Sequence, residues 1–306
     1  GCPHENDGGD NDDNICTEGM SKSQCAEKKL CNLKLTKEEC QKRALIKPVN
    51  EKDFISWGSK DLSGATREKN KILDKFIVPS KWPLLLRRQK SMLLFGTPGN
   101  GKTQIARALP YLFQDTSDQE MINEQNGVKL YTVTGATFKG SLVGETEKNI
   151  HRYFVTLECD AINSVSPDNV FNMLFIDEID AIAGSRVSDR TGLMTSSVNQ
   201  LLQDMGGVVS YNHVVTIGAT NFPWALDSAI LRRFGVQIFV DLPGNNARQD
   251  ICAGMFANRI LGKETFNNNQ AAVAKLYDED AFKSFCTYIS GATGWQSEAP
   301  KYLQDH

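Results

Sequence analysis

The fold is decided by the stretch Ser91-Met-Leu-Leu-Phe-Gly-Thr-Pro-Gly-Asn-Gly-Lys-Thr103, in which a short apolar run leads into the pattern G-x-x-x-x-G-K-[ST]. An amphipathic stretch from Lys102 to Leu112 follows. Between a strand and a helix this pattern predicts a phosphate-binding loop, because glycines let backbone N–H groups curl around phosphate oxygens. The helix also directs the positive end of its dipole at the phosphates. A glycine-rich turn with an incidental lysine is the alternative, and the strand–loop–helix context disfavours it.

The predicted phosphate contacts are the loop residues and the residue after them: Gly96, Thr97, Pro98, Gly99, Asn100, Gly101, Lys102, Thr103 and Gln104. Lys102 is expected to reach the β- and γ-phosphates, and Thr103 to coordinate Mg²⁺. ATP and Mg²⁺ are therefore the expected cofactors. A GTP-dependent switch is disfavoured because the sequence has no guanine-reading N-K-x-D segment; Asn70-Lys-Ile-Leu73 fails at its last position.

A second acidic site is needed to hold Mg²⁺ and to position water, and Met173-Leu-Phe-Ile-Asp-Glu-Ile-Asp180 provides one after another apolar run. Asp177 is the predicted carboxylate of the metal shell, and Glu178 the group that orients or deprotonates the attacking water. Asp180 is predicted to be structural. A strand end capped by two acids is the alternative reading of the Asp-Glu pair.

Polar residues follow the next predicted strand. The predicted strand Val214–Ala219 leads into Thr220 and Asn221. Asn221 could hold the lytic water, or could be an ordinary loop residue. Asp227-Ser-Ala-Ile-Leu-Arg-Arg-Phe234 then places Arg232 and Arg233 at the end of a short helix. The fixed fork of arginine suits a γ-phosphate, and an arginine supplied by a neighbouring subunit can contribute much of the rate of phosphoryl transfer. The alternative is a solvated helix end.

Alternating apolar runs and amphipathic stretches predict an α/β fold, a P-loop NTPase with a five-stranded parallel sheet. The predicted strands are Ser91–Phe95, Lys129–Val133, Met173–Ile176, Val214–Ala219 and Gln237–Val240, and the predicted helices are Lys102–Leu112, Glu145–Leu157 and Thr195–Met205. After Pro243 only helical patterns remain. Three regions are expected: residues 1–53 as a poorly ordered acidic leader or linker, 54–243 as the large nucleotide-binding domain, and 244–306 as the beginning of a small helical lid.

Composition narrows the possible functions. The 306 residues carry a net charge of -3 with a pI of about 5.9, so the whole chain has no basic footprint for nucleic acid. No stretch approaches the roughly eighteen apolar residues that span a bilayer. ATP use and reduced thiols favour an intracellular, cytoplasmic setting.

Five of the eight cysteines lie in the leader: Cys2, Cys16, Cys25, Cys31 and Cys40. Their spacing fits no C-x-x-C zinc knuckle and their number is odd for a disulfide set, so scattered thiols are favoured over a small metal or disulfide module. The other three, Cys159, Cys252 and Cys286, are predicted to be packing residues. The chain starts at Gly1 without an initiator Met, which indicates an internal segment or a processed product.

The run from Trp57 to Met255 resembles AAA ATPases of the meiotic clade, which includes katanin, spastin, fidgetin and the vacuolar-sorting ATPase that disassembles ESCRT filaments. The likeness is densest over Gly218–Phe234. It implies that Asn221 is sensor 1 and that Arg232 and Arg233 are fingers that reach the neighbouring subunit's site. It also implies that the segment from Asp61 to Gly64 holds adenine through its backbone.

Members of this family form ring hexamers that pull a polypeptide through a central pore. The resemblance therefore implies a ring homo-oligomer and a protein substrate, gripped by a pore loop containing Leu142 and Val143. Leu142 stands where the family has an aromatic residue, so it has no flat ring to stack on substrate side chains. Ser196 and Ser197 are a second departure, because the sorting ATPase has arginines there.

Two further expectations follow from the same resemblance. Gly291–Gly294 looks like the turn before the nucleotide-facing helix of the lid, and the chain ends soon afterwards, which indicates a fragment. The expected function is an ATP hydrolase with Walker A, Walker B, sensor 1 and arginine fingers that remodels protein complexes. An ATP-regulated scaffold with little hydrolysis is the alternative, and steady-state ATP turnover separates the two.

Overall fold

The computed structural model describes residues 47–50, 53–55, 62, 65–81, 89–113, 128–140, 142, 144–162, 172–186, 192–206, 211–244, 247–248 and 251. Most of the predicted leader, Asp61, Gly64, Val143 and nearly all of the predicted lid lie outside these residues; residues 47–50 and 53 of the leader are described. The turn predicted at Gly291–Gly294 also lies outside the described residues.

Five parallel strands form one sheet in the order β2-β3-β4-β1-β5, as the apolar runs predicted. They are β1 (Ser91–Phe95), β2 (Lys129–Thr134), β3 (Asn172–Asp177), β4 (Val214–Thr220) and β5 (Val236–Phe239). Each lies within two residues of its predicted bounds. Since β1 is central and the chain then crosses to the far edge at β2, the loop after β1 lies where ligands bind in open α/β sheets.

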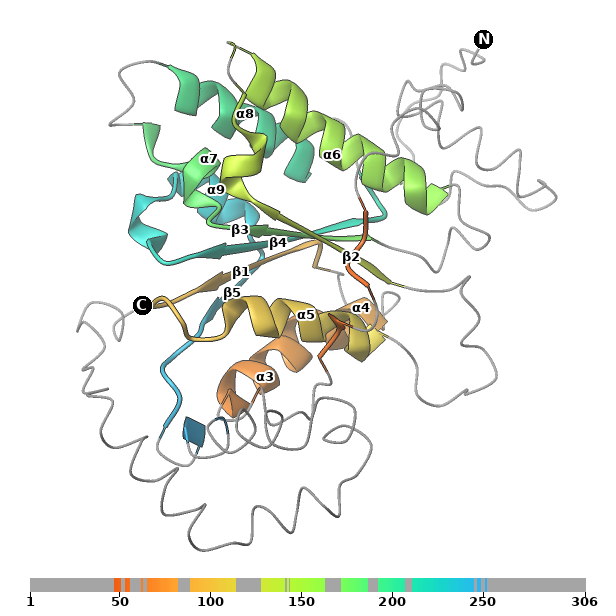
Figure 1. Ribbon diagram of the computed structural model, residues 1–306, viewed down its shortest axis with the longest axis vertical. Helices are drawn as coiled ribbons and strands as arrows, with labels where there is room; N and C mark the ends of the chain where they lie inside the picture. The colour runs from red at the N-terminus through yellow and green to blue at the C-terminus, as the bar shows by residue number, and fades with distance from the viewer. Residues whose placement is uncertain are drawn as a thin grey trace, which may run out of the picture.

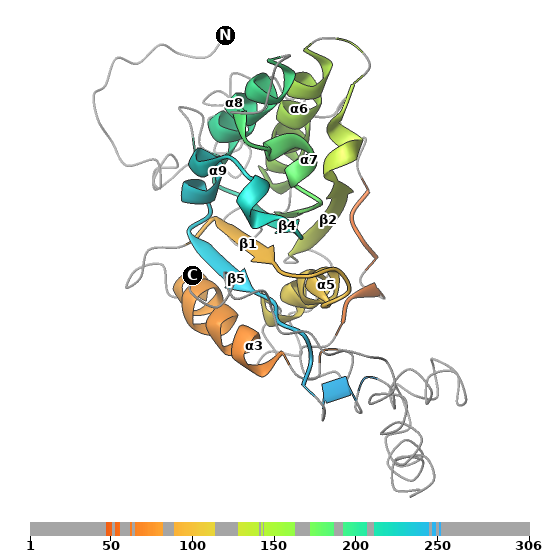
Figure 2. The ribbon, with the colours of Figure 1, turned by 90° about the vertical axis from the view of Figure 1, so that its left-hand side faces the viewer.

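Helices cover both faces of the sheet, as Figures 1 and 2 show. One face carries α6 (Glu145–Ile162), α7 (Asp180–Ala183), α8 (Leu193–Gly206), α9 (Ser228–Arg233) and the 3₁₀ turns η5 (Gly135–Phe138) and η8 (Pro223–Ala225). The other carries α3 (Thr66–Ile72), the π-turn η4 (Leu73–Ile77), α4 (Val78–Lys81) and α5 (Lys102–Phe113). Successive side chains of β1 enter different cores, Leu93 on the α6 side and Met92 and Leu94 on the α5 side.

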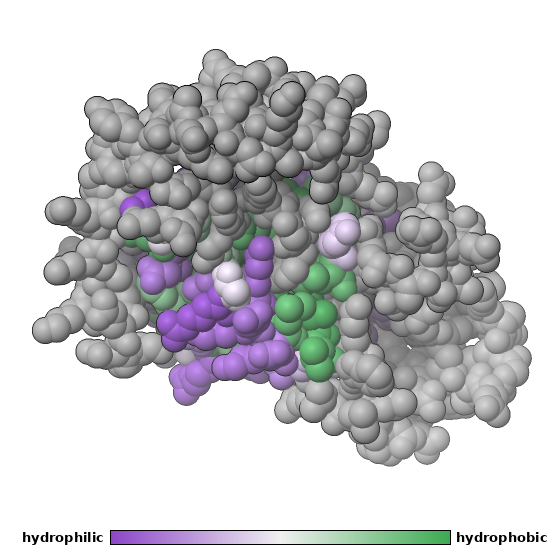
Figure 3. All heavy atoms as spheres, turned by 90° about the horizontal axis from the view of Figure 1, so that it is seen from below, coloured by the Kyte–Doolittle hydropathy of each residue, from purple (hydrophilic) through white to green (hydrophobic). Residues whose placement is uncertain are grey.

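The sequence did not predict α3, η4, α4 and α7. In α3 the residues before Ile72 are all polar, so the apolar spacing that marks a helix is weak; only Glu68 and Ile72 are buried. Figure 3 views the molecule from below, the side on which α3 lies, and shows hydrophilic and hydrophobic surface next to each other there. The four-residue α7 is too short for a periodic signal.

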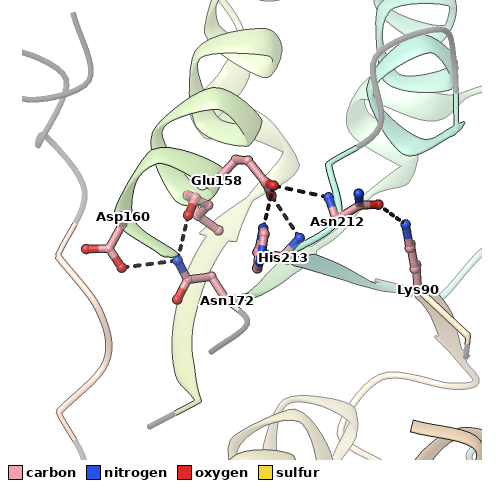
Figure 4. Close-up of polar contacts among 7 residues, drawn as sticks. Lys90, Glu158, Asp160, Asn172, Asn212 and His213 are labelled. Atoms are coloured by element: carbon pink, nitrogen blue, oxygen red, sulfur yellow. Dashed lines mark hydrogen bonds and ion pairs between the residues drawn. The ribbon is translucent and has the colours of Figure 1, made fainter. Parts of the chain in front are cut away.

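A buried polar cluster ties the carboxyl end of α6 to the starts of β3 and β4 (Figure 4). The carboxylate of Glu158 accepts hydrogen bonds from the backbone N–H groups of Asn212 (3.2 Å) and His213 (2.9 Å), and lies 2.6 Å from Nδ1 of His213. Asn172 donates through Nδ2 to the carbonyl of Leu157 (2.6 Å) and to Asp160 (3.1 Å). These contacts fix the amino edge of the sheet, and through it the strand ends on the opposite side.

Cys159 lies in the same turn of α6 and is 2% exposed, in agreement with its prediction as a packing residue. It also forms a disulfide, which the sequence did not predict. The second cysteine lies outside the described residues. Among the helices of the described part of the chain, none is long and apolar enough to cross a membrane.

Candidate nucleotide-binding site

The loop from Gly96 to Thr103 joins β1 to α5 at the carboxyl edge of the sheet. A Cβ on Gly96 would lie 2.3 Å from the carbonyl oxygen of Val240, so only glycine fits there. Gly99 and Gly101 adopt φ of +80° and +85°, and a Cβ on either would point into open space. These glycine conformations are those of a tight turn between a strand and a helix, where backbone N–H groups can bind the triphosphate of a nucleotide.

The remaining loop residues hold or border this surface. Asn100 donates through Nδ2 to the carbonyl of Val240 at 2.8 Å, which ties the loop to the end of β5. Pro98 is exposed, Thr97 is partly buried, and Gln104 is exposed on the first turn of α5. The nine predicted phosphate-binding residues thus form the loop after β1 and the first turn of α5.

Lys102 is buried, and its ammonium points back across the loop. Nζ donates to the carbonyls of Gly96 and Thr97, both at 2.9 Å, and to Oδ1 of Asn221 at 2.7 Å. Burial lowers the pKa of Lys102, and the charge of Asp177 opposes this by raising it. The hydrogen bonds hold the tip of Lys102 beside the side chain predicted as sensor 1.

Asp177 ends β3, and its Oδ2 accepts a hydrogen bond from Oγ1 of Thr103 at 3.0 Å. Mg²⁺ takes oxygen ligands in octahedral geometry, commonly one or two protein oxygens together with phosphate oxygens and water. A hydroxyl and a carboxylate side by side at the mouth of the phosphate loop are a donor set of this kind. These residues therefore fit the predicted Mg²⁺ site.

Glu178 is exposed and has a left-handed backbone with φ of +50°, unlike every other non-glycine residue in the described part of the chain. Its N–H donates to Oδ1 of Asp177 at 3.0 Å. Such a backbone is rare for a residue with a side chain, and it persists only where the surroundings hold it. Glu178 is thus an exposed residue, held in this conformation directly after the end of β3.

Asp180 supports the Asn221 loop, in agreement with its prediction as structural. It accepts a hydrogen bond from Oγ1 of Thr220 at 2.6 Å, and the same hydroxyl accepts from the N–H of Phe222 at 3.0 Å. Asn221 lies between these two anchored residues. The sequence did not predict the part that Thr220 takes, although a hydroxyl immediately before the amide was a visible signal.

The two arginines do not join this constellation. Asp227 caps α9 by accepting from the N–H of Ala229 at 2.8 Å and pairs with Arg186 at 3.0 Å. Arg232 and Arg233 are exposed at the other end of α9, and the carbonyl of Arg233 accepts from Oγ of Ser91 at 2.6 Å.

Ser91 begins β1, whereas the phosphate loop follows its last residue. The arginine pair consequently lies at the amino edge of the sheet, opposite the phosphate loop.

Leu142, the predicted pore-loop residue, is 75% exposed. Its backbone N–H donates to Oε2 of Glu145 at 3.1 Å. Ser196 hydrogen-bonds Glu147, so at one of the two serine positions the side chain joins α8 to α6 within this chain. Ser197 is 5% exposed. Asp61, Gly64 and Val143 are not among the described residues, so their predicted roles remain predictions.

Known proteins match most of this region. Residues 92–242 match the family model described as "ATPase family associated with various cellular activities (AAA)". Human "Vacuolar protein sorting-associated protein 4A" is 30% identical over 245 residues, which make up 78% of this chain and 50% of that protein. The "Vesicle-fusing ATPase" of Arabidopsis thaliana is 36% identical over 215 residues, 66% of this chain and 27% of that protein.

An archaeal protein matches as well. "Protein SAV" of Sulfolobus acidocaldarius is 34% identical over 231 residues, which cover 73% of this chain and 26% of that protein. The chain thus spans about half the length of the vacuolar sorting relative and about a quarter of the other two.

Proposed function

Because the chain belongs to the AAA family of ATPases, as its resemblance to the meiotic clade predicted, we propose that it hydrolyses ATP as a subunit of a ring. We further propose that the ring is a homo-oligomer, a hexamer, whose active sites are completed by arginines from the neighbouring subunit. The energy of hydrolysis is used to remodel or disassemble protein complexes.

One observation carries this proposal: the phosphate loop and the arginine pair lie at opposite edges of the same sheet. Arg233 is bound to Ser91 at the start of β1, and the loop begins after Phe95. Four strand steps of about 3.3 Å separate these two ends by about 13 Å. An arginine side chain is shorter than that, so neither arginine serves its own phosphate loop, and a second copy can present them instead.

The residues at the carboxyl edge of the sheet, where the phosphate loop lies, each have a separate role in the proposed reaction. Thr103 and Asp177 would hold Mg²⁺, which would neutralise charge on the phosphate oxygens. Lys102 binds the β- and γ-phosphates. Glu178 accepts the proton of the attacking water, and Asn221 orients that water. The in-line geometry requires no covalent step from the protein, only positioning and electrostatic stabilisation.

The kind of substrate is proposed from the relatives. Their names refer to vacuolar protein sorting and to vesicle fusion, and we propose that this chain likewise acts on protein assemblies. Leu142 is exposed on its loop and offers an apolar contact to a polypeptide. Adenine is held by the backbone of residues 61–64. We place the activity in an intracellular, cytoplasmic setting. A disulfide at Cys159 would be uncommon there, and the intact mass of the purified protein with and without reductant shows whether the bond is present.

A second function has one observation in its favour. Leu142 has no aromatic face with which to grip a substrate, which is compatible with a scaffold whose conformation depends on bound ATP but which hydrolyses little of it. Steady-state ATP turnover of the wild-type protein separates the two functions. Sustained turnover excludes the scaffold, and nucleotide binding without turnover excludes the remodelling enzyme.

The shared site is tested by mixing two inactive variants in the full-length protein. Arg232→Ala with Arg233→Ala keeps Glu178 but lacks the fingers, and should lose roughly 10³-fold in turnover. Glu178→Gln keeps the fingers but lacks the residue that activates water. At a mixed interface the first variant receives intact arginines from the second, so activity should recover in part.

Arg152→Ala, at an exposed position of α6, is the matched control and should hydrolyse ATP normally. Sedimentation must show that both inactive variants still assemble. Near-normal turnover in the arginine variant, or no recovery in mixtures that do assemble, would overturn the proposal.

A further inference from the structure

Gly135, the first residue of η5, lies directly against the backbone of Glu178. β2 and β3 pair in parallel with Thr134 opposite Asp177, so the residues that follow the two strands meet beyond the sheet edge. A Cβ on Gly135 would lie 2.4 Å from the carbonyl oxygen of Glu178, 3.3 Å from its carbonyl carbon and 3.0 Å from Cβ of Ala181. No side chain fits this position unless one of these atoms moves.

The carbonyl oxygen of Glu178 is the atom that an added side chain at residue 135 would displace first. It accepts the N–H of Ala181 at 3.0 Å, the contact that turns the chain into α7. The same residue has the left-handed φ of +50°. A non-glycine residue stays in that region only when contacts on several sides hold it, and the glycine face of η5 is one of those sides.

On its other side η5 is firmly anchored. Phe138 is fully buried and packs edge-on against Tyr153, with ring centroids 4.8 Å apart. Its carbonyl accepts from Nδ2 of Asn149 on α6 at 3.1 Å. Because η5 is fixed to α6 in this way, an added methyl group at residue 135 has little room to move back. The strain would fall on the Glu178 turn.

We propose that Gly135 is a positioning residue for ATP hydrolysis: the absence of its side chain holds the Glu178 backbone where the carboxylate meets the attacking water. This inference rests on the proposed role of Glu178. The atoms nearest to a Cβ on Gly135 belong to Glu178 and Ala181, whereas Lys102 hydrogen-bonds to the loop carbonyls and to Asn221. The effect of Gly135 should therefore appear in the rate of the chemical step and not in the binding of nucleotide.

The test is Gly135→Ala, measured for turnover and for nucleotide affinity. Displacing a reacting group by about 1 Å can cost on the order of 10²-fold, so kcat should fall by roughly 10- to 100-fold. The Kd for ADP from calorimetry should stay at the wild-type value. Gly184→Ala is the matched control, because its Cβ would approach the carbonyl of Asp180 only to 3.4 Å, an ordinary contact, and it should keep wild-type kcat.

Two further variants make the outcome decisive. In the Glu178→Gln background, Gly135→Ala should cause no additional loss of turnover, since both changes act on one group. If Gly135→Ala fails to fold, Ala181→Gly added to it removes the 3.0 Å contact with Cβ of Ala181 and leaves the contact with the Glu178 carbonyl. The kcat of this double variant should lie between those of Ala181→Gly and Glu178→Gln.

Wild-type kcat in folded Gly135→Ala, or an equal loss in Gly184→Ala, would overturn the positioning role. A weakened Kd for ADP with unchanged kcat would do so too. Wild-type turnover in Glu178→Gln would instead refute the proposed function itself.

Discussion

Replacing Lys102 by alanine is the most direct perturbation of the phosphate site. The ammonium is buried beneath the loop and donates to three oxygens, so its position is fixed within the site before any ligand is considered. The change removes the long cation that the described residues place over the phosphates. We expect ATP binding to be lost at ordinary nucleotide concentrations.

The size of the loss can be worked out from the contacts. A hydrogen bond to a charged group contributes about 1.5–3 kcal/mol net, so contacts to the β- and γ-phosphates together contribute about 3–6 kcal/mol. At 1.4 kcal/mol for each factor of ten, Kd should rise by roughly 10²- to 10⁴-fold. The lower end is favoured because the ammonium exchanges existing contacts with Gly96, Thr97 and Asn221.

Titration calorimetry with ADP and with a non-hydrolysable ATP analogue, both with Mg²⁺, measures this loss. Lys75→Ala is the control, because Lys75 is an exposed lysine on η4 and belongs to neither the phosphate loop nor the strand ends that carry Asp177 and Asn221. Thermal denaturation must show that both variants are folded. An unchanged Kd in folded Lys102→Ala would mean that the phosphate site has been placed wrongly.

Four shorter predictions concern other residues. Glu178→Gln should retain ATP and lose turnover, since an amide cannot accept the proton of water; quench-flow of bound ATP checks this, and normal turnover would remove Glu178 from the mechanism. Burial lowers the pKa of Lys102 below the ordinary lysine pKa of 10.5, so nucleotide affinity should begin to fall with rising pH before pH 10.5 is reached. Lys102→Arg should bind more weakly, but its affinity should not fall at alkaline pH. Leu142→Asp should abolish work on a protein substrate and leave the melting temperature unchanged; unfolding would mean that Leu142 is a core residue. Glu158→Ala leaves buried N–H groups around His213 unpaired, so the free energy of unfolding should drop by roughly 3–5 kcal/mol in chemical denaturation, and a negligible drop would contradict the contacts of Figure 4.

Much of the fold could be read from the sequence because its strands are buried on both faces. Such strands are continuous apolar runs, as Ser91–Phe95 and Val214–Thr220 are, and their burial decides their structure wherever they lie in the chain. The phosphate loop could also be predicted from the sequence, because left-handed backbone conformations such as those of Gly99 and Gly101 require glycine, and glycines at fixed spacing are visible in the sequence. Polar segments gave no such signal, which is why α3 was missed.

The residue patterns predicted which residues form the site, but its spatial division was implied only by the family resemblance. The sequence places Arg232 and Arg233 close to Asn221 along the chain, and only the course of α9 shows that they lie at the opposite edge of the sheet. The close approach of Gly135 to Glu178 depends on the register of β2 and β3, which no local pattern encodes. Contacts between segments far apart in the sequence depend on the tertiary structure and could not be predicted from local sequence patterns.

The central claim is that the active site is shared between two copies of this chain. The most direct measurement is ATP turnover per chain of the wild-type full-length protein as a function of its concentration, with sedimentation recorded on the same samples. Turnover per chain should be very low where the protein is monomeric and should rise in step with the assembled fraction, because shared sites form by mass action. Turnover per chain that stays constant down to concentrations at which only monomer sediments would contradict the account.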